Sequence, residues 1–506
     1  MTRAKEDIGR GLAAARAGRP IPAGERVHVI GAAGAGASAA ALLAARAGAA
    51  VSGCDPAAPS PYSAALEAVG ITVLDRHSVE HLTTPAAEGR PIERLAVTKA
   101  LTAVDPDHPE LRTAHELGIT VEPWQQLVAD AATTSRQALV SVAGTHGKST
   151  TAGWLVHLLV GAGRDPSAFV GALLDPALSG GAPATARWGT GPEFIVEADE
   201  YAGNFDPYQP ALAVLLNAEW DHPDVFADRA AVLDAFADWL HRAQGARAAG
   251  RSVLVANVGD AGAAEVVDKL RGWSGRTVSV GLDVERADIS AIIEPVAAGS
   301  SRLLVRRAGQ APTTFEIGLA GRHNAANALA VIGVAHVLGI PDEPLRASLA
   351  SFGGVGRRME LVGEEGGVTV LDDYAHHPTA IARTLEAVRQ RYPGRRVWAA
   401  YEPLTYHRTA AMLDEFAVAL AAADAVAVAD IWAGRDPDTT ITSSPALAAA
   451  VTARGGPSAS APGSVEATAD HLAAAVQPGD VVLVMGGGRS YVIAHRLVLL
   501  LRARSA

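Results

Sequence analysis

Three segments of this chain share one order: an apolar run, a glycine turn and then an alanine- and leucine-rich stretch. The first reads "RVHVIGAAGAGASAAALLAA", the second reads "ALVSVAGTHGKSTTAGWLVHLLV", and the third lies between "GRRVWAAYEP" and "GDVVLVMGGG". Each segment is typical of a strand, a tight turn and a helix. Because strands that alternate with helices form parallel sheets, we expect an α/β protein.

The chain length indicates more than one core. At 506 residues it exceeds the usual size of one domain and predicts about three. A polar stretch at 129–137 precedes the second segment, and a glycine-rich stretch at 349–361 precedes the third. We therefore expect domains at 1–134, 135–350 and 351–506.

Composition narrows the class of partner and the compartment. The formal net charge is -11, which does not favour a nucleic-acid or anionic-membrane partner. The single cysteine, Cys54, fits a reducing compartment. The apolar stretch after Ala39 contains Arg46 and is too short to span a bilayer, and the first residues lack the apolar core of a signal peptide. We expect a cytoplasmic protein without membrane insertion; the oligomeric state is left open.

The first glycine cluster, "GAAGAG", has glycines at 31, 34 and 36. This is not the G-x-G-x-x-G dinucleotide fingerprint, but such a loop still brings backbone N–H groups toward an anion at a helix start. Asp55 ends the next apolar run, where a ribose acceptor is often found. Two alternatives stay open: small residues that only allow tight packing, and an NAD-dependent dehydrogenase.

The second cluster, "GTHGKST", indicates a phosphate loop. The pattern G-x-x-x-x-G-K-[ST] is met at Gly147, Lys148 and Ser149, but Val142 stands where the first glycine should be. Backbone N–H groups near Gly144 would meet phosphate oxygens, the lysine would add charge, and the serine hydroxyl would bind Mg²⁺. The alternative is an ordinary turn with an exposed lysine.

Acidic and imidazole groups follow two apolar runs after this loop. They are Glu197, Asp199, Glu200, Asp221 and His222. Strand ends of a parallel sheet meet at one edge, so these groups are placed for a cation. The alternative is that they are solvated loop residues.

Six motifs in order resemble the Mur ligases of peptidoglycan synthesis. They are "GTHGKST", "EADEY", "NAEWDHPD", "GLAGRHNAANALA", "GVGRRMEL" and "DDYAHHPTAI". The chain is most similar to the branch that joins L-alanine to UDP-N-acetylmuramate, from about Val27 to the last glycine motif. The resemblance implies a Rossmann-like N-terminal domain for the UDP-sugar, a central P-loop-type ATPase domain with a parallel sheet, and a Rossmann-like C-terminal domain for the amino acid. The family's loop motif, G-T-x-G-K-[ST], also lacks the distant glycine.

The resemblance further implies ATP and Mg²⁺ as cofactors, and an amide bond formed through an acyl phosphate. The nucleotide-binding residues it implies are Gly144, Thr145, Gly147, Lys148, Ser149, Thr150, His323, Asn324, Asn327, Arg358 and Asp373. The metal ligands it implies are Ser149, Glu197 and His222. The substrate-binding residues it implies are Gly34, Gly36, Asp55, His77, Tyr374, His376 and Arg408. The catalytic residues it implies are Lys148, Glu197, His222 and His376, with His376 expected to deprotonate the amino acid.

Two of the stretches that depart from the family pattern bear on predicted binding residues. Ala33 stands in the first loop where glycine is common, and alanine is costly wherever φ must be positive. In "YEPLTYHRT", Leu404 and Thr405 replace a histidine and an arginine, so that Arg408 alone is left for bidentate carboxylate binding. Two acceptors therefore stand beside L-alanine: a preformed murein tripeptide, as in a recycling ligase, or another amino acid.

Overall fold

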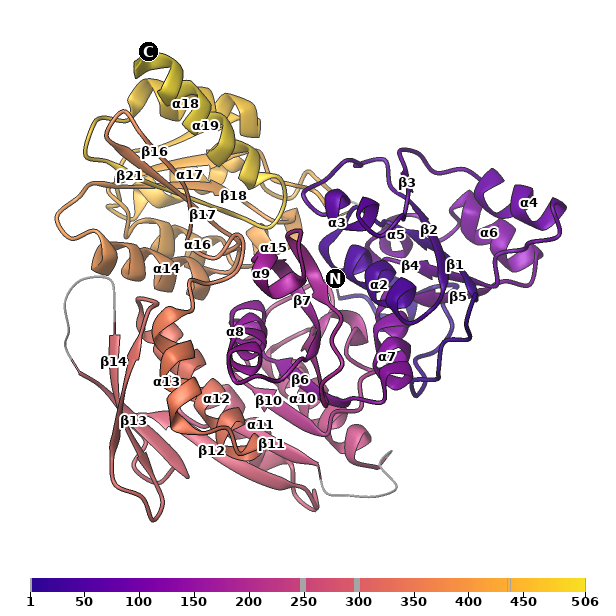
Figure 1. Ribbon diagram of the computed structural model, residues 1–506. Coiled ribbons are helices and arrows are strands. Elements are labelled where there is room, and N and C mark those ends of the chain that lie inside the picture. Colours follow the sequence, from indigo (N-terminus) through magenta and orange to yellow (C-terminus); the bar gives the residue numbers. More distant parts are fainter. Residues whose placement is uncertain (1, 246–251, 295–300, 435, 437, 506) are drawn as a thin grey trace.

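Three β-sheets lie in order along the chain, each flanked by helices (Figure 1). The computed structural model describes residues 2–245, 252–294, 301–434, 436 and 438–505. The strands of the three sheets lie within 26–123, 138–317 and 360–486. We call each sheet with its helices the first, central and third unit. The predicted α/β class is confirmed.

The first unit has a parallel sheet in the order β3-β2-β1-β4-β5, the arrangement of nucleotide-binding Rossmann folds. Its strands are β1 (Arg26–Ile30), β2 (Ala50–Cys54), β3 (Val73–Leu74), β4 (Arg94–Val97) and β5 (Thr120–Pro123). Its helices are α1 (Lys5–Ile8), α2 (Ala35–Arg46), α3 (Ser63–Glu67), α4 (Glu80–Ala87), α5 (Lys99–Val104), α6 (Pro109–Glu116) and α7 (Trp124–Ser135). Val27 and Val29 pack on the side of α2 and α7, whereas Ile30 packs on the side of α4 and α6.

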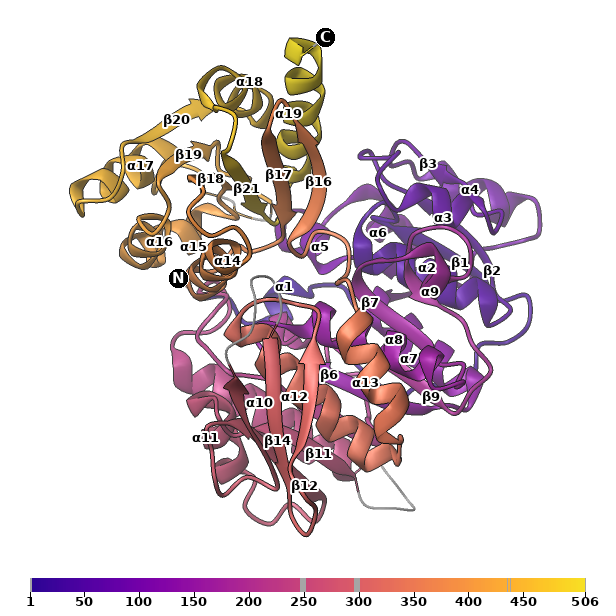
Figure 2. The same cartoon turned by 60° about the vertical axis from the view of Figure 1, so that its left-hand side comes forward.

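The central unit has a ten-stranded sheet in the order β15-β14-β13-β12-β11-β10-β6-β9-β7-β8. This unit lies below the third unit in Figure 2. Its strands are β6 (Ala138–Ala143), β7 (Ser167–Leu174), β8 (Ala184–Arg187), β9 (Glu193–Ala198), β10 (Leu212–Leu215), β11 (Val253–Asn257), β12 (Arg276–Leu282), β13 (Ile289–Glu294), β14 (Ser301–Arg307) and β15 (Thr313–Ile317). Its helices are α8 (Lys148–Gly161), α9 (Pro176–Ser179), the 3₁₀ helix η1 (Tyr201–Gly203), α10 (Arg229–Gly245), α11 (Ala261–Lys269), α12 (Arg322–Leu338) and α13 (Asp342–Ser351). The expected parallel pairing holds from β13 to β7, and both edges add antiparallel strands, β14 and β15 at one and β8 at the other.

The third unit has a six-stranded sheet in the order β16-β17-β21-β18-β19-β20, parallel except for β16. Its strands are β16 (Glu360–Glu365), β17 (Val368–Asp373), β18 (Val397–Glu402), β19 (Ala425–Ala429), β20 (Ala459–Gly463) and β21 (Val481–Gly486). Its helices are α14 (Pro378–Arg391), α15 (Tyr406–Ala411), α16 (Leu413–Leu420), α17 (Ser444–Ala453), α18 (Val465–Ala475) and α19 (Ser490–Ser505). Alternate strand residues enter two apolar cores, one under α14, α16 and α17 and the other under α18 and α19.

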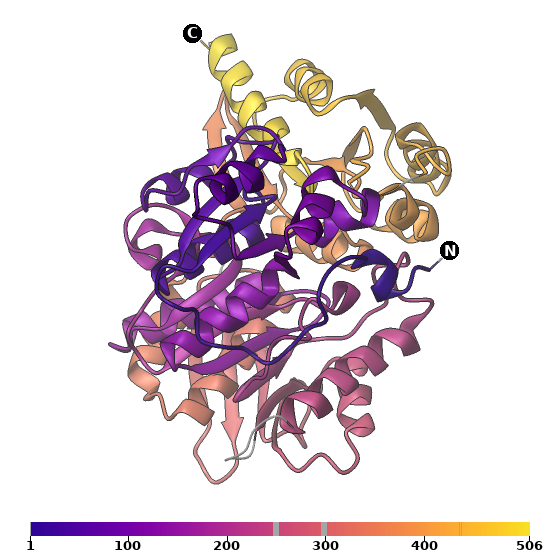
Figure 3. The ribbon, with the colours of Figure 1, turned by 90° about the vertical axis from the view of Figure 1, so that its right-hand side faces the viewer.

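The N-terminal segment joins two units (Figure 3). Ile8 of α1 packs with Ala103 of α5 and with Tyr201 of η1. The backbone N–H of Arg3 also donates to the carbonyl of Asp224 at 2.7 Å. This contact fixes the first unit beside the central one, at the edge where the candidate site lies.

Helix length and apolarity bear on membrane insertion. Helices α10 and α12 have 17 residues each, and a bilayer span needs about 20 predominantly apolar residues. Within the part of the chain that the structure describes, no helix combines the length and apolarity that a membrane crossing requires.

Candidate active site

A cavity of about 770 Å³ is lined by all three units. The first unit contributes Gly36 and Lys99, and the third contributes Arg358 and His376. The central unit contributes the loop residues 145–147 and the start of α8. A cavity of this volume suits a small-molecule or cofactor ligand.

The loop between β6 and α8 depends on two glycines with positive φ, Gly144 at 141° and Gly147 at 81°. A Cβ at Gly144 would lie 3.1 Å from the backbone of Asn217, and one at Gly147 would lie 2.6 Å from Oδ1 of Asn327. The His146 amide donates to Oδ1 of Asn217 at 2.8 Å, which ties the loop to the end of β10. The loop therefore turns the N-terminus of α8 to the cavity, where N–H groups can bind phosphate oxygens.

Lys148, the first residue of α8, is held among carbonyl and carboxylate groups. Its Nζ donates to the Gly144 carbonyl at 2.6 Å and to Oε2 of Glu200 at 2.9 Å. Burial lowers the pKa of Lys148, but the charges of Glu200, Asp199 and Glu197 outweigh burial and raise it above its ordinary value. The ammonium group therefore stays charged, as phosphate binding requires.

Three possible metal ligands gather beside Lys148. Ligand atoms of Asp199, Glu200 and His222 lie within 4.8 Å of one another. Burial, with the nearby charge of Asp199, raises the pKa of Glu200 to about 7 despite the ion pair with Lys148. A buried carboxylate with a second one close by behaves in this way. Two carboxylates and an imidazole suit a divalent cation.

Two residues predicted as metal ligands have other partners here. Oε2 of Glu197 accepts from the Gly171 amide at 2.7 Å, and Oγ of Ser149 accepts from Nη2 of Arg358 at 3.2 Å. Both side chains line the cavity, and their contact with a metal stays a prediction. The sequence placed several acids at this strand end, but spacing alone did not show which of them turn toward the imidazole.

The predicted adenine-contacting residues lie at the start of α12 and line the same cavity. Nδ1 of His323 is buried and has no hydrogen-bond partner in the described part of the chain. Burial lowers the pKa of His323 to about 4, so the ring is neutral at physiological pH. Asn324 donates to the Ala320 carbonyl at 2.7 Å, and Asn327 contacts the phosphate loop. An unpaired buried nitrogen at the cavity wall suits a polar ligand.

Asp373 shapes the loop that carries Arg358. Its carboxylate accepts from the amides of Met359 and Ala375, both at 2.8 Å. The guanidinium of Arg358 lies 5.2 Å from the centre of the Tyr374 ring. This packing directs a cation of the third unit to the phosphate loop of the central unit.

His376 is placed as a neutral base. Its Nδ1–H donates to the Tyr374 carbonyl at 2.8 Å, which leaves Nε2 as the basic nitrogen. Burial, followed by the charge of Arg408, lowers the pKa of His376 well below its ordinary value. The imidazole therefore carries no proton on Nε2 at physiological pH, and the lowered pKa makes it a weaker base than an ordinary histidine.

Five predicted residues lie outside the cavity wall. They are Gly34, Asp55, His77, Gly144 and Arg408. Asp55 accepts from the amides of Ala33 at 3.0 Å and Ala57 at 2.8 Å, and so holds the first glycine loop. Positive φ in that loop falls on Gly31, so alanine at 33 is compatible with it. Substrate contacts of these five residues stay predictions.

Arg408 links the third unit to the central one. It is 2% exposed, and its Nε donates to Oδ1 of Asp221 at 2.8 Å. Its Nη2 donates to Nδ1 of His222 at 3.1 Å. Burial raises the pKa of Asp221, but Arg408 outweighs it and holds that pKa well below its usual range. In this structure the arginine binds a buried aspartate, whereas Leu404 lines the cavity.

Lys99 lines the cavity and was not predicted. It follows β4, and its Nζ donates to the Ala202 carbonyl at 2.7 Å. Burial lowers the pKa of Lys99 to about 8. Its only sequence signal was its position directly after an apolar run, at the strand edge where ligands of parallel sheets bind.

Three family descriptions match the chain in order. They are the Mur ligase family catalytic domain over 26–136, the Mur ligase middle domain over 142–335 and the Mur ligase glutamate ligase domain over 357–488. The chain belongs to the Mur ligase family. This Mur ligase membership replaces the dehydrogenase alternative for the first glycine cluster.

Individual Mur ligases match over nearly the whole chain. The UDP-N-acetylmuramate–L-alanine ligase of Kineococcus radiotolerans is 37% identical over 95% of this chain and 97% of its own. That of Frankia casuarinae is 37% identical over 82% of this chain and 84% of its own. The structure of the UDP-N-acetylmuramate–alanine ligase of Thermotoga maritima superposes with a TM-score of 0.76, at 22% identity, over 95% of this chain and 99% of that one. This structural likeness shows the shared three-unit fold.

Proposed function

We propose that this Mur ligase joins L-alanine to the lactyl carboxylate of UDP-N-acetylmuramate in peptidoglycan precursor synthesis, with ATP and Mg²⁺ as cofactors. Relatives of that name, 37% identical over up to 95% of the chain, support the substrate pair. The observation that carries the proposal is the cavity wall, where the phosphate loop and Lys148 share one space with His376 of the third unit. A single cysteine and the absence of a membrane-crossing helix among the described residues are compatible with the cytoplasm as its location.

The first step would activate a poor electrophile. Transfer of the γ-phosphoryl group of ATP to the lactyl carboxylate gives an acyl phosphate and ADP. Lys148 and the N–H groups at the start of α8 would hold the phosphates in line for this transfer. Asp199, Glu200 and His222 would hold Mg²⁺, which when bound neutralises charge on the phosphate oxygens.

The second step would form the amide bond. The neutral amine of L-alanine attacks the acyl carbon, and the tetrahedral intermediate releases phosphate. Nε2 of His376 would accept the proton from the incoming ammonium group, since the other ring nitrogen is held by the Tyr374 carbonyl. The cavity would keep water from the acyl phosphate once the three units close around the substrates.

The proposal that L-alanine is the acceptor has two alternatives. Leu404 lines the cavity at the position of a family histidine, and its apolar side chain cannot bind a carboxylate. The alternative acceptors are therefore a murein tripeptide and another amino acid. Phosphate release would be measured with ATP, UDP-N-acetylmuramate and, separately, L-alanine, glycine, L-serine and an L-Ala-D-Glu-containing tripeptide. We expect release with L-alanine. Phosphate release with the tripeptide alone would indicate a recycling ligase. Release with glycine or L-serine alone would indicate a divergent Mur ligase with another acceptor. If no acceptor gives phosphate release, the ligase proposal is contradicted.

A further inference from the structure

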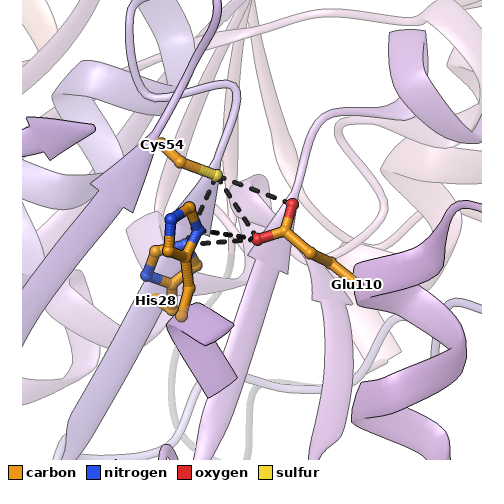
Figure 4. Close-up of side chains that lie close together, drawn as sticks. His28, Cys54 and Glu110 are labelled. Atoms are coloured by element: carbon orange, nitrogen blue, oxygen red, sulfur yellow. Dashed lines mark hydrogen bonds and ion pairs between the residues drawn. The ribbon is translucent and has the colours of Figure 1, made fainter. Parts of the chain in front are cut away.

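A buried cluster of metal-ligating side chains lies in the first unit, apart from the cavity described above. It consists of His28 on β1, Cys54 at the end of β2, His81 on α4 and Glu110 on α6. His28, Cys54 and Glu110 are each at most 1% exposed. Figure 4 shows the histidine and the cysteine pointing from neighbouring strands toward the carboxylate that comes from the facing helix.

The surroundings of this cluster are apolar. Ile30, Leu82 and Leu111 form the core between the sheet and the two helices that carry His81 and Glu110. A carboxylate buried in such a core is costly unless a cation pairs with it. Among the described residues, the ion pairs of Glu110 are all with imidazoles: His28, His77, His81 and His108. The site therefore lacks the lysine or arginine that usually balances a buried acid.

The distances between the ligand atoms fit a tetrahedral ion. Nε2 of His28 lies 3.4 Å from Sγ of Cys54, and this sulfur lies 3.7 Å from Oε1 of Glu110. Nδ1 of His81 lies 2.9 Å and Nε2 of His28 lies 3.9 Å from the same oxygen. Tetrahedral zinc with its usual bond lengths separates its nitrogen, oxygen and sulfur ligands by about 3.3–3.6 Å. All four ligand atoms lie within 4.8 Å of one another, so binding of the ion would require the side chains to adjust to those separations.

The orientation and charge of the ligands also suit zinc. Nδ1 of His28 lies 2.8 Å from Oγ of Ser52, a contact that directs Nε2 into the cluster. A third histidine, His77, has its Nδ1 3.2 Å from Oε2 of Glu110 and 3.3 Å from Sγ of Cys54, and so orients both groups. One thiolate, one carboxylate and two neutral imidazoles carry a total charge that a divalent cation neutralises.

We propose that His28, Cys54, His81 and Glu110 form a structural zinc site. Binding of the cation displaces the thiol proton of Cys54 to solvent, and the bound ion links two strands to α4 and α6. None of these four residues lines the cavity described above.

Cobalt(II) titration of the chelator-treated full chain tests the site. The chain has a single cysteine, so any thiolate-to-cobalt absorption band reports this site alone. The titration is done with excess magnesium, which occupies oxygen-ligand sites elsewhere. We expect the band to saturate at one cobalt per chain and to disappear when zinc is added. A folded chain that binds no cobalt through sulfur overturns the proposal and leaves a hydrogen-bonded histidine–glutamate network.

Matched variants distinguish the proposed zinc ligands from a nearby histidine that does not bind the metal. Cys54→Ser is expected to remove the band, and Glu110→Gln to raise the dissociation constant at least about tenfold. His115→Gln removes an exposed histidine from the same helix and is expected to leave the affinity unchanged. If a ligand variant does not fold, X-ray absorption at the zinc edge of the unmodified protein tests the site instead. One sulfur among the atoms that coordinate zinc supports the proposal. Coordination without sulfur contradicts it.

Discussion

At the scale of the residue, the candidate site depends on opposite charges buried close together. Lys148 lies 2.9 Å from Glu200 and 3.8 Å from Asp199. Without the ammonium group, the buried carboxylate of Glu200 and the partly exposed one of Asp199 would lie close together with no lysine charge beside them. The same lysine is therefore expected to keep the metal ligands in place and to hold the phosphates.

The first prediction is that Lys148→Ala lowers kcat by about 10²–10³-fold or more, since it removes a charge that stabilises the transferring phosphoryl group. Steady-state ADP release measures this. Lys269→Ala provides the control, because that lysine is exposed and pairs with Asp234 on the surface. Ligation that persists unchanged in Lys148→Ala would show that the loop does not bind the nucleotide phosphates.

The second prediction concerns His376 as a base. His376→Gln is expected to lower kcat about 10²-fold while the KM for ATP stays the same. Because the variant must use the free amine of L-alanine, its kcat should rise with pH more steeply than that of the unmodified enzyme. A pH profile parallel to the unmodified one would assign His376 a packing role only.

Sequence reasoning found part of this residue-scale picture. It predicted Lys148 and His222, which line the cavity, because strand, loop and helix patterns are local; their roles stay predictions. It did not show that Asp199 and Glu200 turn to His222, or that Arg408 binds Asp221, because these orientations are set by packing between units. The cluster at Cys54 was also missed, since its ligands come from four separate segments with no common spacing.

At the scale of the element, the start of α8 is set by backbone conformation. Among the residues that the structure describes, no side chain caps this helix; Gly147 precedes it with φ 81°. The sequence predicted the strand, loop and helix of this segment, and parallel pairing through the centre of the sheet. It did not predict the antiparallel edge strands β8, β14 and β15, because short alternating strands resemble loops when read without their partners.

The third prediction is that Gly147→Ala destabilises the chain by about 1–3 kcal/mol and weakens ATP binding. Its Cβ would meet Oδ1 of Asn327 at 2.6 Å in a conformation that alanine rarely adopts. Gly161→Ala is the matched control: it ends the same helix, and an added Cβ meets nothing within 4 Å. Thermal unfolding and nucleotide titration measure both variants. Equal effects of the two substitutions would contradict this account of the loop.

At the scale of the whole molecule, the central and third units meet through charged contacts. Oε2 of Glu219 accepts from the Thr379 hydroxyl at 2.6 Å, and lies 3.3 Å from Nε2 of His146. Burial raises the pKa of Glu219, but hydrogen bonds from His146 and Thr379 outweigh it and lower that pKa to about 2. The sequence predicted three units, but it carried no signal for this junction.

The fourth prediction follows from the sign of that shift. Because the folded pKa lies below the ordinary value of 4.5, ionised Glu219 stabilises the folded chain above pH 4.5, and this is lost as pH falls toward 2. Glu219→Gln is expected to cost about 1–3 kcal/mol at neutral pH and to reduce the acid sensitivity of the melting temperature. The control is Glu265→Gln, because Glu265 forms an exposed ion pair with Arg229. This substitution should change neither the stability at neutral pH nor the acid sensitivity of the melting temperature. An unchanged acid dependence in Glu219→Gln would contradict the assignment.

The most direct test of the ligase account follows one oxygen atom. UDP-N-acetylmuramate with heavy oxygen in its lactyl carboxylate is incubated with ATP, Mg²⁺, L-alanine and the enzyme. Mass spectrometry then measures the sugar nucleotide and the released phosphate. An acyl phosphate pathway predicts one alanine added per ADP formed, with one heavy oxygen transferred to phosphate. Phosphate without heavy oxygen, or ADP formed without an alanylated product, would contradict it.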